Sequence, residues 1–375
     1  MRVRCHETDI ASATDCLAPF DVIMRATSTS TRRDFLGLAI GLGGSLWSGA
    51  GRAQSASADK QPITIQLTLD RPIDAAVSPF VMAGVAGLFS AEGLAVTTNV
   101  AGGSQDAITR VSAGMSDFAL VDINTLIRAR DQHGAAPIKA IFVLFNHAPY
   151  AIIARRSRGI RALSDIEGKN LGVAEGDLSI RLWPAVARQN GIKPQSVKRS
   201  SISPAVREPM LSAGQVDAVT GFSYLSPINL RDRGVPADDL AVLRFAEYGC
   251  EAYGAALIVN PNLAAAKPEA VKGFVRAVIT GTHLAIKEPA RAVTEVVSRM
   301  DAGSRELEAE RLRAIISDNI LTTEVKQHGI GGIDTVRFER SIEQIAEDFK
   351  FQKRPTAADI FDDAFLPPPD GRAVN

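Results

Sequence analysis

The chain of 375 residues has few of the residues that form metal and disulfide sites, with three cysteines and five histidines. Cys5 and Cys16 lie close to the N-terminus, so Cys250 is the one cysteine in the main body of the sequence. No pair of cysteines remains there to form a disulfide, and no spacing of His and Cys matches a zinc site. We therefore expect no metal and no cofactor.

An excess of charge of either sign is also missing. The sequence carries 42 Lys and Arg against 42 Asp and Glu, and no segment after residue 60 concentrates the basic residues. Binding to nucleic-acid phosphates needs such a local excess, so we expect no nucleic-acid partner. With 46% hydrophobic and 22% charged residues, the composition is that of a well-packed globular protein.

The N-terminal region has the pattern of an export signal. Arg32 and Arg33 precede an apolar, glycine-rich run over residues 36–50, and small residues follow at 51–53 and 56–58. This pattern predicts a leader over residues 1–53 that the twin-arginine translocase exports to the periplasm, with cleavage near Ala53. The run of about 15 apolar residues is too short for a stable membrane anchor. A start codon at Met24 would give a leader of more ordinary length, and residues 1–23 would then be a mis-assigned start.

From residue 62 onward, the sequence alternates between strand and helix patterns. Residues 63–69 alternate apolar with polar side chains at period two, and residues 78–90 carry apolar side chains at helical spacing. We expect further strands at 94–100, 117–121, 138–145, 170–173, 217–221, 240–245 and 255–259, with helices at 104–113, 125–132, 178–190, 204–213 and most of 268–351. Regular alternation of this kind predicts an α/β fold with a largely parallel sheet.

One motif occurs once in each half of the chain. Residues 112–119 (SAGMSDFA) and 212–219 (SAGQVDAV) both end a helix at Gly and begin a strand with Asp. Because Gly commonly caps helices in the left-handed conformation, the similarity can arise in any helix-to-strand connection. The alternative is two similar α/β lobes. Their ligand would then bind in a cleft between the carboxyl ends of the two sets of strands.

Several segments resemble a known family of transport proteins. They are Leu69-Asp70 with Pro72, residues 87–94 (GLFSAEGL), 102–104 (GGS), 113–119 (AGMSDFA), 163–172, 213–218 (AGQVDA) and 255–272. Across about residues 62–290 the sequence is similar to substrate-binding proteins of nitrate, taurine and sulfonate ABC importers, a group that includes binding proteins for the thiamine pyrimidine precursor.

The resemblance implies a bilobal periplasmic-binding-protein fold of type II, in which two α/β lobes close by bending at a two-segment hinge. Lobe 1 is expected to hold residues 62–155 and 254–350, lobe 2 residues 156–248, and residues 351–375 an irregular C-terminal tail. The crossings between the lobes are expected near 155–159 and 245–254.

Candidate ligand contacts in lobe 1 follow its predicted strands or open its helices. Asp70 could pair with a ligand amino group and Arg71 with an anion, although Asp70 could equally cap the next helix. A glycine-rich loop leaves backbone N–H groups free for an anion or a carbonyl oxygen, or forms an ordinary turn. These lobe 1 candidates are Asp70, Arg71, Gly102, Gly103, Ser104, Asp122 and Asn124.

In lobe 2, a second glycine loop and several aromatic residues are candidates. Trp183 could stack on a ligand or lie in the core. Tyr224 follows the strand predicted at 217–221, and this position suits a residue of a lid that contacts the ligand. The mixture of carboxylates and rings near residue 250 suits a cationic or amide ligand, or packs in the hinge. The lobe 2 and crossover candidates are Gly176, Asp177, Ser179, Trp183, Tyr224, Glu247, Tyr248 and Tyr253.

We expect a monomeric binding protein that delivers a small polar molecule to the permease subunits of an ABC importer. A sulfonate, nitrate, a carboxylate and a heteroaromatic amine all remain open as ligands. A pyrimidine-precursor synthase is the enzymatic alternative, but its relatives carry a cysteine-rich run beside a sacrificed His, and this sequence has neither that run nor a G-x-S-x-G motif. A periplasmic sensory protein is the remaining alternative. We expect no enzymatic activity.

Overall fold

The computed structural model describes residues 61–374. The predicted leader, its cleavage site and the start at Met24 lie outside these residues. Within the described part of the chain, no helix is long and apolar enough to cross a membrane.

The first of two five-stranded sheets contains the first and the last strand of residues 61–374. Its strands occur in the order β2-β1-β3-β10-β4, with β1 parallel to both neighbours and β10 antiparallel to β3 and β4. We call the part of the chain built on this sheet lobe 1. Its strands are β1 (Ile63–Leu69), β2 (Leu94–Val100), β3 (Phe118–Asp122), β4 (Lys139–Val143) and β10 (Ala255–Val259).

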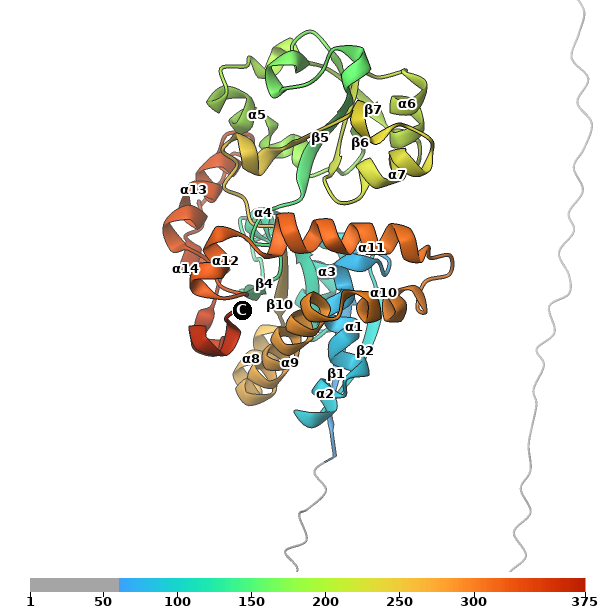
Figure 1. The fold of residues 1–375 in the computed structure, drawn as a ribbon. Coiled ribbons are helices and arrows are strands. Elements are labelled where there is room, and N and C mark those ends of the chain that lie inside the picture. The colour runs from blue at the N-terminus through green and yellow to red at the C-terminus, as the bar shows by residue number, and fades with distance from the viewer. Residues whose placement is uncertain (1–60, 375) are drawn as a thin grey trace, which may run out of the picture. The chain divides into compact units, whose positions relative to one another are not determined.

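The second sheet is formed by the middle of the sequence, which we call lobe 2 (Figure 1). The strand order is β7-β6-β8-β5-β9, and β5 is antiparallel to both β8 and β9. The strands are β5 (Tyr150–Arg155), β6 (Asn170–Ala174), β7 (Lys198–Ile202), β8 (Ala218–Phe222) and β9 (Leu240–Arg244). The helices of lobe 2 are α5 (Ser179–Gln189), α6 (Arg207–Ala213) and α7 (Ser226–Asp232).

The remaining helices precede lobe 2 or follow it. They are α1 (Ser78–Val85), α2 (Leu88–Ala91), α3 (Ser104–Ser112), α4 (Ile123–Ala129), α8 (Pro261–Ala266), α9 (Pro268–Lys287), α10 (Pro289–Val297), α11 (Arg305–Ala314), α12 (Thr323–His328), α13 (Thr335–Ala346) and α14 (Ala357–Ile360). A 3-10 turn at Ala75–Val77 precedes α1, and a π-helical turn at Ile315–Ile320 follows α11.

The core of lobe 1 forms where α1 and α9 pack closely. The ring of Phe274 on α9 stacks on Phe118 at a centroid distance of 4.2 Å and on Phe89 at 4.8 Å. Gly281 faces the carbonyl of Pro79, and a Cβ at this position would overlap that oxygen. The close approach of the two helices therefore depends on a residue without a side chain.

The repeated motif occupies equivalent places in the two sheets. Gly114 and Gly214 both have left-handed backbone conformations, with φ of 73° and 77°. Asp117 accepts a hydrogen bond from the backbone N–H of Gln66 at 2.8 Å, and Asp217 accepts one from Asn170 at the same distance. Each aspartate thus ties the start of a central strand to its parallel neighbour, and the predicted bilobal α/β fold is confirmed.

The first lobe boundary differs from the one expected. The segment Tyr150–Arg155 was assigned to lobe 1, but as β5 it pairs with β8 and β9 in the second sheet. The chain therefore passes between the sheets between Val143 and Tyr150, earlier than residues 155–159, and returns between Arg244 and Ala255. β5 is buried along nearly all its length, like the central strands of lobe 1. Burial therefore does not reveal which sheet β5 belongs to, and only its pairing with β8 and β9 does.

The C-terminal segment is also more structured than the expected irregular tail. Residues 351–375 include the short helix α14, and Phe361 forms an isolated parallel bridge with Ala140 of β4. The N–H of Ile330 donates to the carbonyl of Arg372 at 2.9 Å. This segment therefore packs against lobe 1, because Ile360 and Phe361 bury their side chains there.

Candidate functional site

A cavity of about 450 Å³ lies where carboxyl ends of strands from both lobes come together. Lobe 1 contributes residues after β1, at the start of α3 and at the end of β3. Lobe 2 contributes the loops after β6, β7 and β8. The lining residues are Asp70, Arg71, Pro72, Ile73, Asp74, Gly103, Ser104, Asp122, Ala174, Glu175, Gly176, Asp177, Leu178, Pro204, Arg207, Phe222, Tyr224 and Leu225. This is the position at which open α/β sheets bind ligands.

Asp70 and Arg71 form a partly buried ion pair at the end of β1. Arg71 donates from Nε and Nη2 to the two oxygens of Asp70 at 2.8 and 3.1 Å. Ser104 Oγ donates to Asp70 Oδ2 at 2.6 Å. The Asp70 carboxylate is therefore held between a guanidinium and a hydroxyl, and the charge of Arg71 is neutralised locally.

Arg71 also reaches across to lobe 2. Its Nη1 donates to the hydroxyl of Tyr224 at 3.1 Å, and its guanidinium carbon lies 5.3 Å from the centre of the Phe222 ring. The Tyr224 ring is fully buried and stacks on Phe222 at a centroid distance of 5.9 Å. One contact between the lobes thus runs through an arginine and two aromatic rings.

Asp122 lies at the end of β3 and caps α4. Its Oδ1 accepts hydrogen bonds from the backbone N–H of Asn124 at 2.8 Å and from Asn124 Nδ2 at 3.0 Å. Tyr150 donates to Oδ2, and the N–H of Asp122 donates to Ser104 Oγ at 3.0 Å. Burial raises the pKa of Asp122 above its ordinary value, although these hydrogen bonds oppose the shift.

Asp177 lies in the loop after β6, next to Gly176, whose φ is 76°. Its Oδ1 accepts hydrogen bonds from Ser179 N at 2.9 Å and from Ser179 Oγ at 2.6 Å. Its Oδ2 has no hydrogen-bond partner among the described residues, and the nearest cation, Arg207 Nη1, is 3.8 Å away. One oxygen of a nearly buried carboxylate is therefore unused in the cavity wall.

Asp74 is the second unusual carboxylate of the cavity. It caps the turn before α1 by accepting from the N–H of Ala76 at 2.9 Å. Burial raises its pKa to about 6, and this rise exceeds the opposing effect of the Arg71 charge. Asp74 therefore changes its protonation state close to neutral pH.

The structure brings most of the candidates named from the sequence to this cavity. Asp70, Arg71, Gly103, Ser104, Asp122, Gly176, Asp177 and Tyr224 line it. Asn124 and Ser179 lie directly behind the wall, where they hold Asp122 and Asp177. Gly102 is not a lining residue, and its N–H donates to Asp106 at 2.8 Å.

Four candidates lie elsewhere. Trp183 is buried in the core of lobe 2, 6.5 Å from the Phe245 ring between centroids, because its position on α5 faces the sheet. Glu247 forms a surface ion pair with Arg244 at 3.1 Å. Tyr248 packs against the core, and the hydroxyl of Tyr253 donates to Glu324 at 2.7 Å. These residues have structural roles in the return crossing and in the core.

Sequence reasoning missed several residues of the site. Asp74, Glu175, Arg207 and Phe222 line the cavity, and Tyr150 supports Asp122. Phe222 directly ends β8, so its position at a strand terminus was a usable signal. Arg207 opens α6 after a short 3-10 turn, and nothing in the local pattern indicates that this turn faces the cleft.

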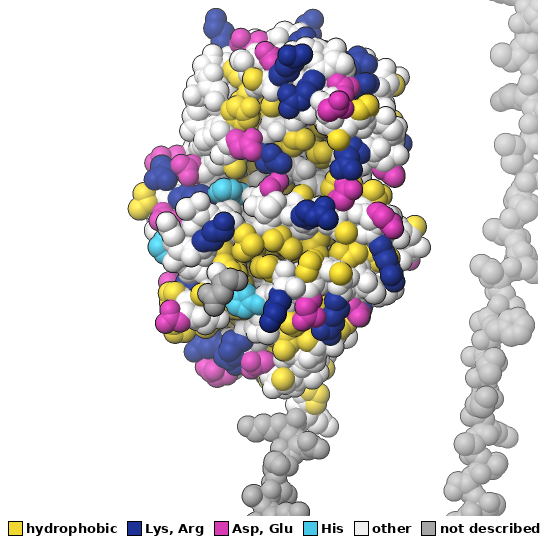
Figure 2. Space-filling model, in the orientation of Figure 1, with side chains coloured by type: hydrophobic (Ala, Val, Ile, Leu, Met, Phe, Trp, Pro, Cys, Tyr) yellow, Lys and Arg dark blue, Asp and Glu magenta, His cyan; other side chains and the backbone are white. Residues whose placement is uncertain are grey.

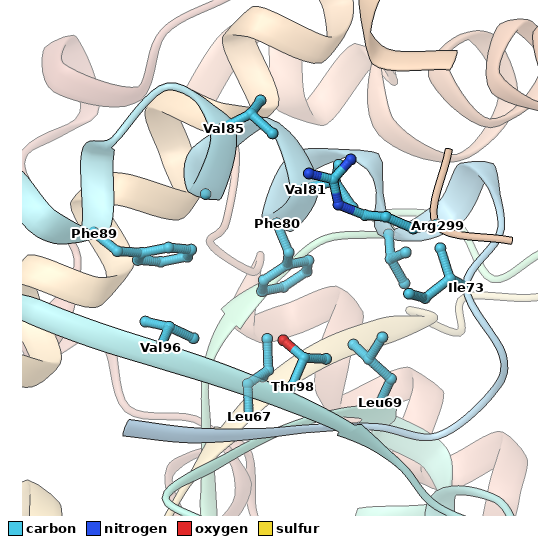
Figure 3. A pocket seen from close by; sticks show the side chains of 12 residues that line it. Leu67, Leu69, Ile73, Phe80, Val81, Val85, Phe89, Val96, Thr98 and Arg299 are labelled. Atoms are coloured by element: carbon cyan, nitrogen blue, oxygen red, sulfur yellow. The ribbon is translucent and has the colours of Figure 1, made fainter. Parts of the chain in front are cut away.

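A second cavity, of about 330 Å³, is lined by residues of lobe 1 and shares Ile73 with the wall of this site. Figure 3 shows its walls, with Leu67 and Leu69 of β1, Phe80 of α1 and Phe89 of α2. Arg299 is the one charged residue among those that line it, and it already pairs with Glu295 at 2.9 Å. None of the predicted ligand contacts lies there.

The remaining titratable groups of interest lie away from the cleft cavity. Cys250 is buried, and burial raises the pKa of its thiol to about 11, so it is protonated at neutral pH. Among the described residues, no group of three or more His, Cys, Asp and Glu is arranged to hold a metal ion. The face of the molecule seen in Figure 2 mixes charges of both signs with apolar patches.

Two sheets joined by two crossings, with a cavity between their carboxyl ends, define a protein with the periplasmic-binding-protein fold. The chain belongs to the NMT1/THI5-like family, which matches residues 74–292, and the predicted resemblance is confirmed.

Comparison with known proteins supports both assignments. The chain is 25% identical over 215 residues to a 4-amino-5-hydroxymethyl-2-methylpyrimidine phosphate synthase of Legionella pneumophila, covering 57% of this chain and 67% of that protein. It is 25% identical over 305 residues to the riboflavin-binding protein RibY of Chloroflexus aurantiacus, covering 78% and 83%. The alkanesulfonate-binding protein SsuA of Xanthomonas axonopodis, solved bound to MOPS, superposes with a TM-score of 0.60 at 16% identity, over 81% of this chain and 99% of that structure.

Proposed function

We propose that this protein captures a small polar solute in the cavity between its lobes and passes it to the permease subunits of an ABC importer in the periplasm. The observation that carries the proposal is the cavity itself, because its wall combines polar side chains from both lobes at the carboxyl ends of both sheets. A ligand held by both lobes stabilises the closed arrangement over the open one, and this difference is the signal that a permease can read.

The chemistry of the cavity suits reversible binding. Its polar lining consists of carboxylates, two guanidinium groups, one serine hydroxyl and the hydroxyl of Tyr224. Four of these groups, on Asp70, Arg71, Ser104 and Tyr224, are held in place by hydrogen bonds with one another, which preorganises them for a ligand. The relatives include a riboflavin-binding protein and structures of sulfonate-binding proteins, which supports a binding role.

A pyrimidine phosphate synthase is the competing function, because a relative of that name matches 57% of the chain. The two functions differ in what happens to the solute. A binding protein returns the solute unchanged, whereas a synthase consumes it or one of its own residues.

The test uses the full chain and a set of sulfonates, carboxylates, nitrate, pyrimidines and flavins. A solute at about 100 times its dissociation constant stabilises the folded state by about 2.7 kcal/mol, which raises the melting temperature by a few degrees. We expect such a shift for one chemical class, a smaller radius of gyration in X-ray scattering, and recovery of the intact solute by mass spectrometry. Cells that lack the protein should lose uptake of that solute.

Arg71→Gln provides the cleft variant and Arg110→Gln its matched control. Arg71 joins the two lobes at the cavity, whereas Arg110 pairs with Asp106 on the surface of lobe 1. The first substitution should weaken binding and the second should leave it unchanged. Chemical conversion of the solute, or uptake that does not depend on the protein, would contradict the proposal.

A further inference from the structure

The charges of the cleft cavity are unbalanced toward the acidic side. Its lining carries five carboxylates and two guanidinium groups. The carboxylates are Asp70, Asp74, Asp122, Glu175 and Asp177, and the guanidinium groups belong to Arg71 and Arg207. With all seven groups ionised, a ligand in the cavity would experience a net charge of about −3, which repels anions and attracts cations.

Each guanidinium already lies beside a carboxylate of the protein. Arg71 makes two hydrogen bonds to Asp70, at 2.8 and 3.1 Å. Arg207 donates from Nε to Glu208 at 3.1 Å, and its Nη1 lies 3.8 Å from Asp177. An anionic ligand would have to compete with these carboxylates for each arginine, and it would leave a buried carboxylate without its partner.

Asp177, in contrast to the two arginines, is a candidate contact for a cation. Its side chain is 4% exposed, its Oδ1 is used by Ser179, and its Oδ2 has no hydrogen-bond partner among the described residues. A nearly buried carboxylate oxygen without a partner is costly unless a donor reaches it. Asp177 lines the cavity, so a ligand can supply that donor once the side chain shifts, because Oδ2 itself is buried in this arrangement.

We propose that the cavity selects a small organic cation with N–H groups, such as an amidinium or a protonated amine, which donates a hydrogen bond to Asp177 Oδ2, and that it excludes sulfonates and carboxylates. This inference rests on the proposed binding function, and it narrows the ligand to one class. Phe222 adds an aromatic ring to the same wall, which suits the apolar part of such a ligand.

The test uses ring compounds of similar size that differ in charge. Benzamidine carries the cation with N–H donors, benzamide is its neutral analogue, and benzoate and benzenesulfonate are the anions. Binding to the full chain is measured by titration calorimetry, with ligand-observed NMR at millimolar concentration. We expect benzamidine to bind at least about tenfold more tightly than either anion, a difference of about 1.4 kcal/mol.

Asp177→Asn isolates the contribution of the unused oxygen. Asn keeps an oxygen that can accept the Ser179 hydrogen bonds, but it removes the negative charge and replaces Oδ2 with an N–H donor. The affinity for benzamidine should fall about tenfold or more. Asp301→Asn, which removes an exposed carboxylate far along the sequence, is the control and should leave the affinity unchanged.

The outcomes separate this inference from the proposed function. Tighter binding of benzoate or benzenesulfonate than of benzamidine overturns the selection of cations but leaves solute capture intact. The same holds if benzamidine binds equally well to the Asp177→Asn protein. If neither these probes nor any solute of the wider set binds, both the inference and the proposed function are wrong.

Discussion

The guanidinium of Arg71 in lobe 1 donates a hydrogen bond to the hydroxyl of Tyr224 in lobe 2, over 3.1 Å. The same arginine is held by Asp70 within its own lobe. A residue of lobe 1 thus presents a fixed donor to lobe 2, and the strength of this contact contributes to how readily the lobes separate.

Tyr224→Phe tests that contact. The substitution keeps the ring packing but leaves one N–H of Arg71 without an acceptor, so the free energy of unfolding should fall by about 1 to 2 kcal/mol. Denaturant unfolding gives the stability, and X-ray scattering gives the separation of the lobes. Tyr248→Phe is the control, because no hydrogen bond of its hydroxyl is present among residues 61–374. Equal stability of the two variants would mean that the cross-lobe hydrogen bond contributes nothing.

A second connection between the lobes joins α7 to α11. Arg231 donates to both oxygens of Glu310 at 2.7 and 3.1 Å, and Arg311 donates to Asn229 at 2.6 Å. Glu310→Gln should change the free energy of unfolding by less than about 1 kcal/mol, because the pair is partly exposed. It should nevertheless increase the open population, measured as a larger radius of gyration without ligand.

Glu343→Gln is the matched control for this pair. Glu343 pairs with Arg354 at 3.2 Å, and both residues lie in the C-terminal part of the chain outside lobe 2. Removing that pair should leave the radius of gyration unchanged. Identical scattering from the two variants would show that the α7–α11 connection does not hold the lobes together.

Asp74 should make stability depend on pH in a definite direction. Its pKa is about 6 in the folded protein and near 3.8 when unfolded, so the folded state holds the proton more tightly. Its contribution to stability is therefore fully present below about pH 4 and is lost as the pH rises to above 6. Asp74→Asn should remove this dependence and raise the free energy of unfolding at pH 7.5 by about 1 to 2 kcal/mol.

Denaturant unfolding between pH 4 and pH 8 checks this expectation. At the acid end, the unmodified protein and the Asp74→Asn variant should have similar stability, and they should diverge toward pH 8. Asp238→Asn, at an exposed position, should follow the unmodified protein throughout. A constant difference between Asp74→Asn and the unmodified protein at all pH values would argue against the shifted pKa.

Two glycine substitutions should have opposite effects on stability. A Cβ at Gly281 on α9 overlaps the carbonyl of Pro79, so Gly281→Ala should destabilise the protein by about 1 to 3 kcal/mol. Gly84 on α1 has no atom within 4 Å of an added Cβ, so Gly84→Ala should stabilise the protein by up to about 1 kcal/mol. Thermal unfolding of both variants measures the difference. Similar melting temperatures would mean that α1 and α9 separate easily.

Much of the fold was readable from local patterns. Apolar alternation located β1, because the side chains of Ile65, Leu67 and Leu69 point to one buried face of the sheet. The Gly-Asp motif located the starts of β3 and β8, because Gly permits the left-handed turn and Asp pairs with the neighbouring strand. These features depend on the sequence near each element, and the sequence alone was sufficient to predict them.

Other elements could not be read in this way. β7 (Lys198–Ile202) has mostly polar and exposed residues, and as the last strand in its sheet it lacks the apolar alternation by which strands are recognised. β5 is apolar, but its pattern fits either sheet. Pairing with β8 and β9 places it in lobe 2, and that pairing involves residues far away in the sequence.

The sequence by itself determined which groups end the strands, among them Asp70, Asp122 and Asp177, and hence which polar side chains are available near the cleft. Only the tertiary structure decided how these groups are used. It paired Arg71 with Asp70, left one oxygen of Asp177 without a partner, and turned Trp183 into the core. The physical reason is that charge balance and burial depend on contacts between distant segments, whereas strand and turn patterns depend on neighbouring residues.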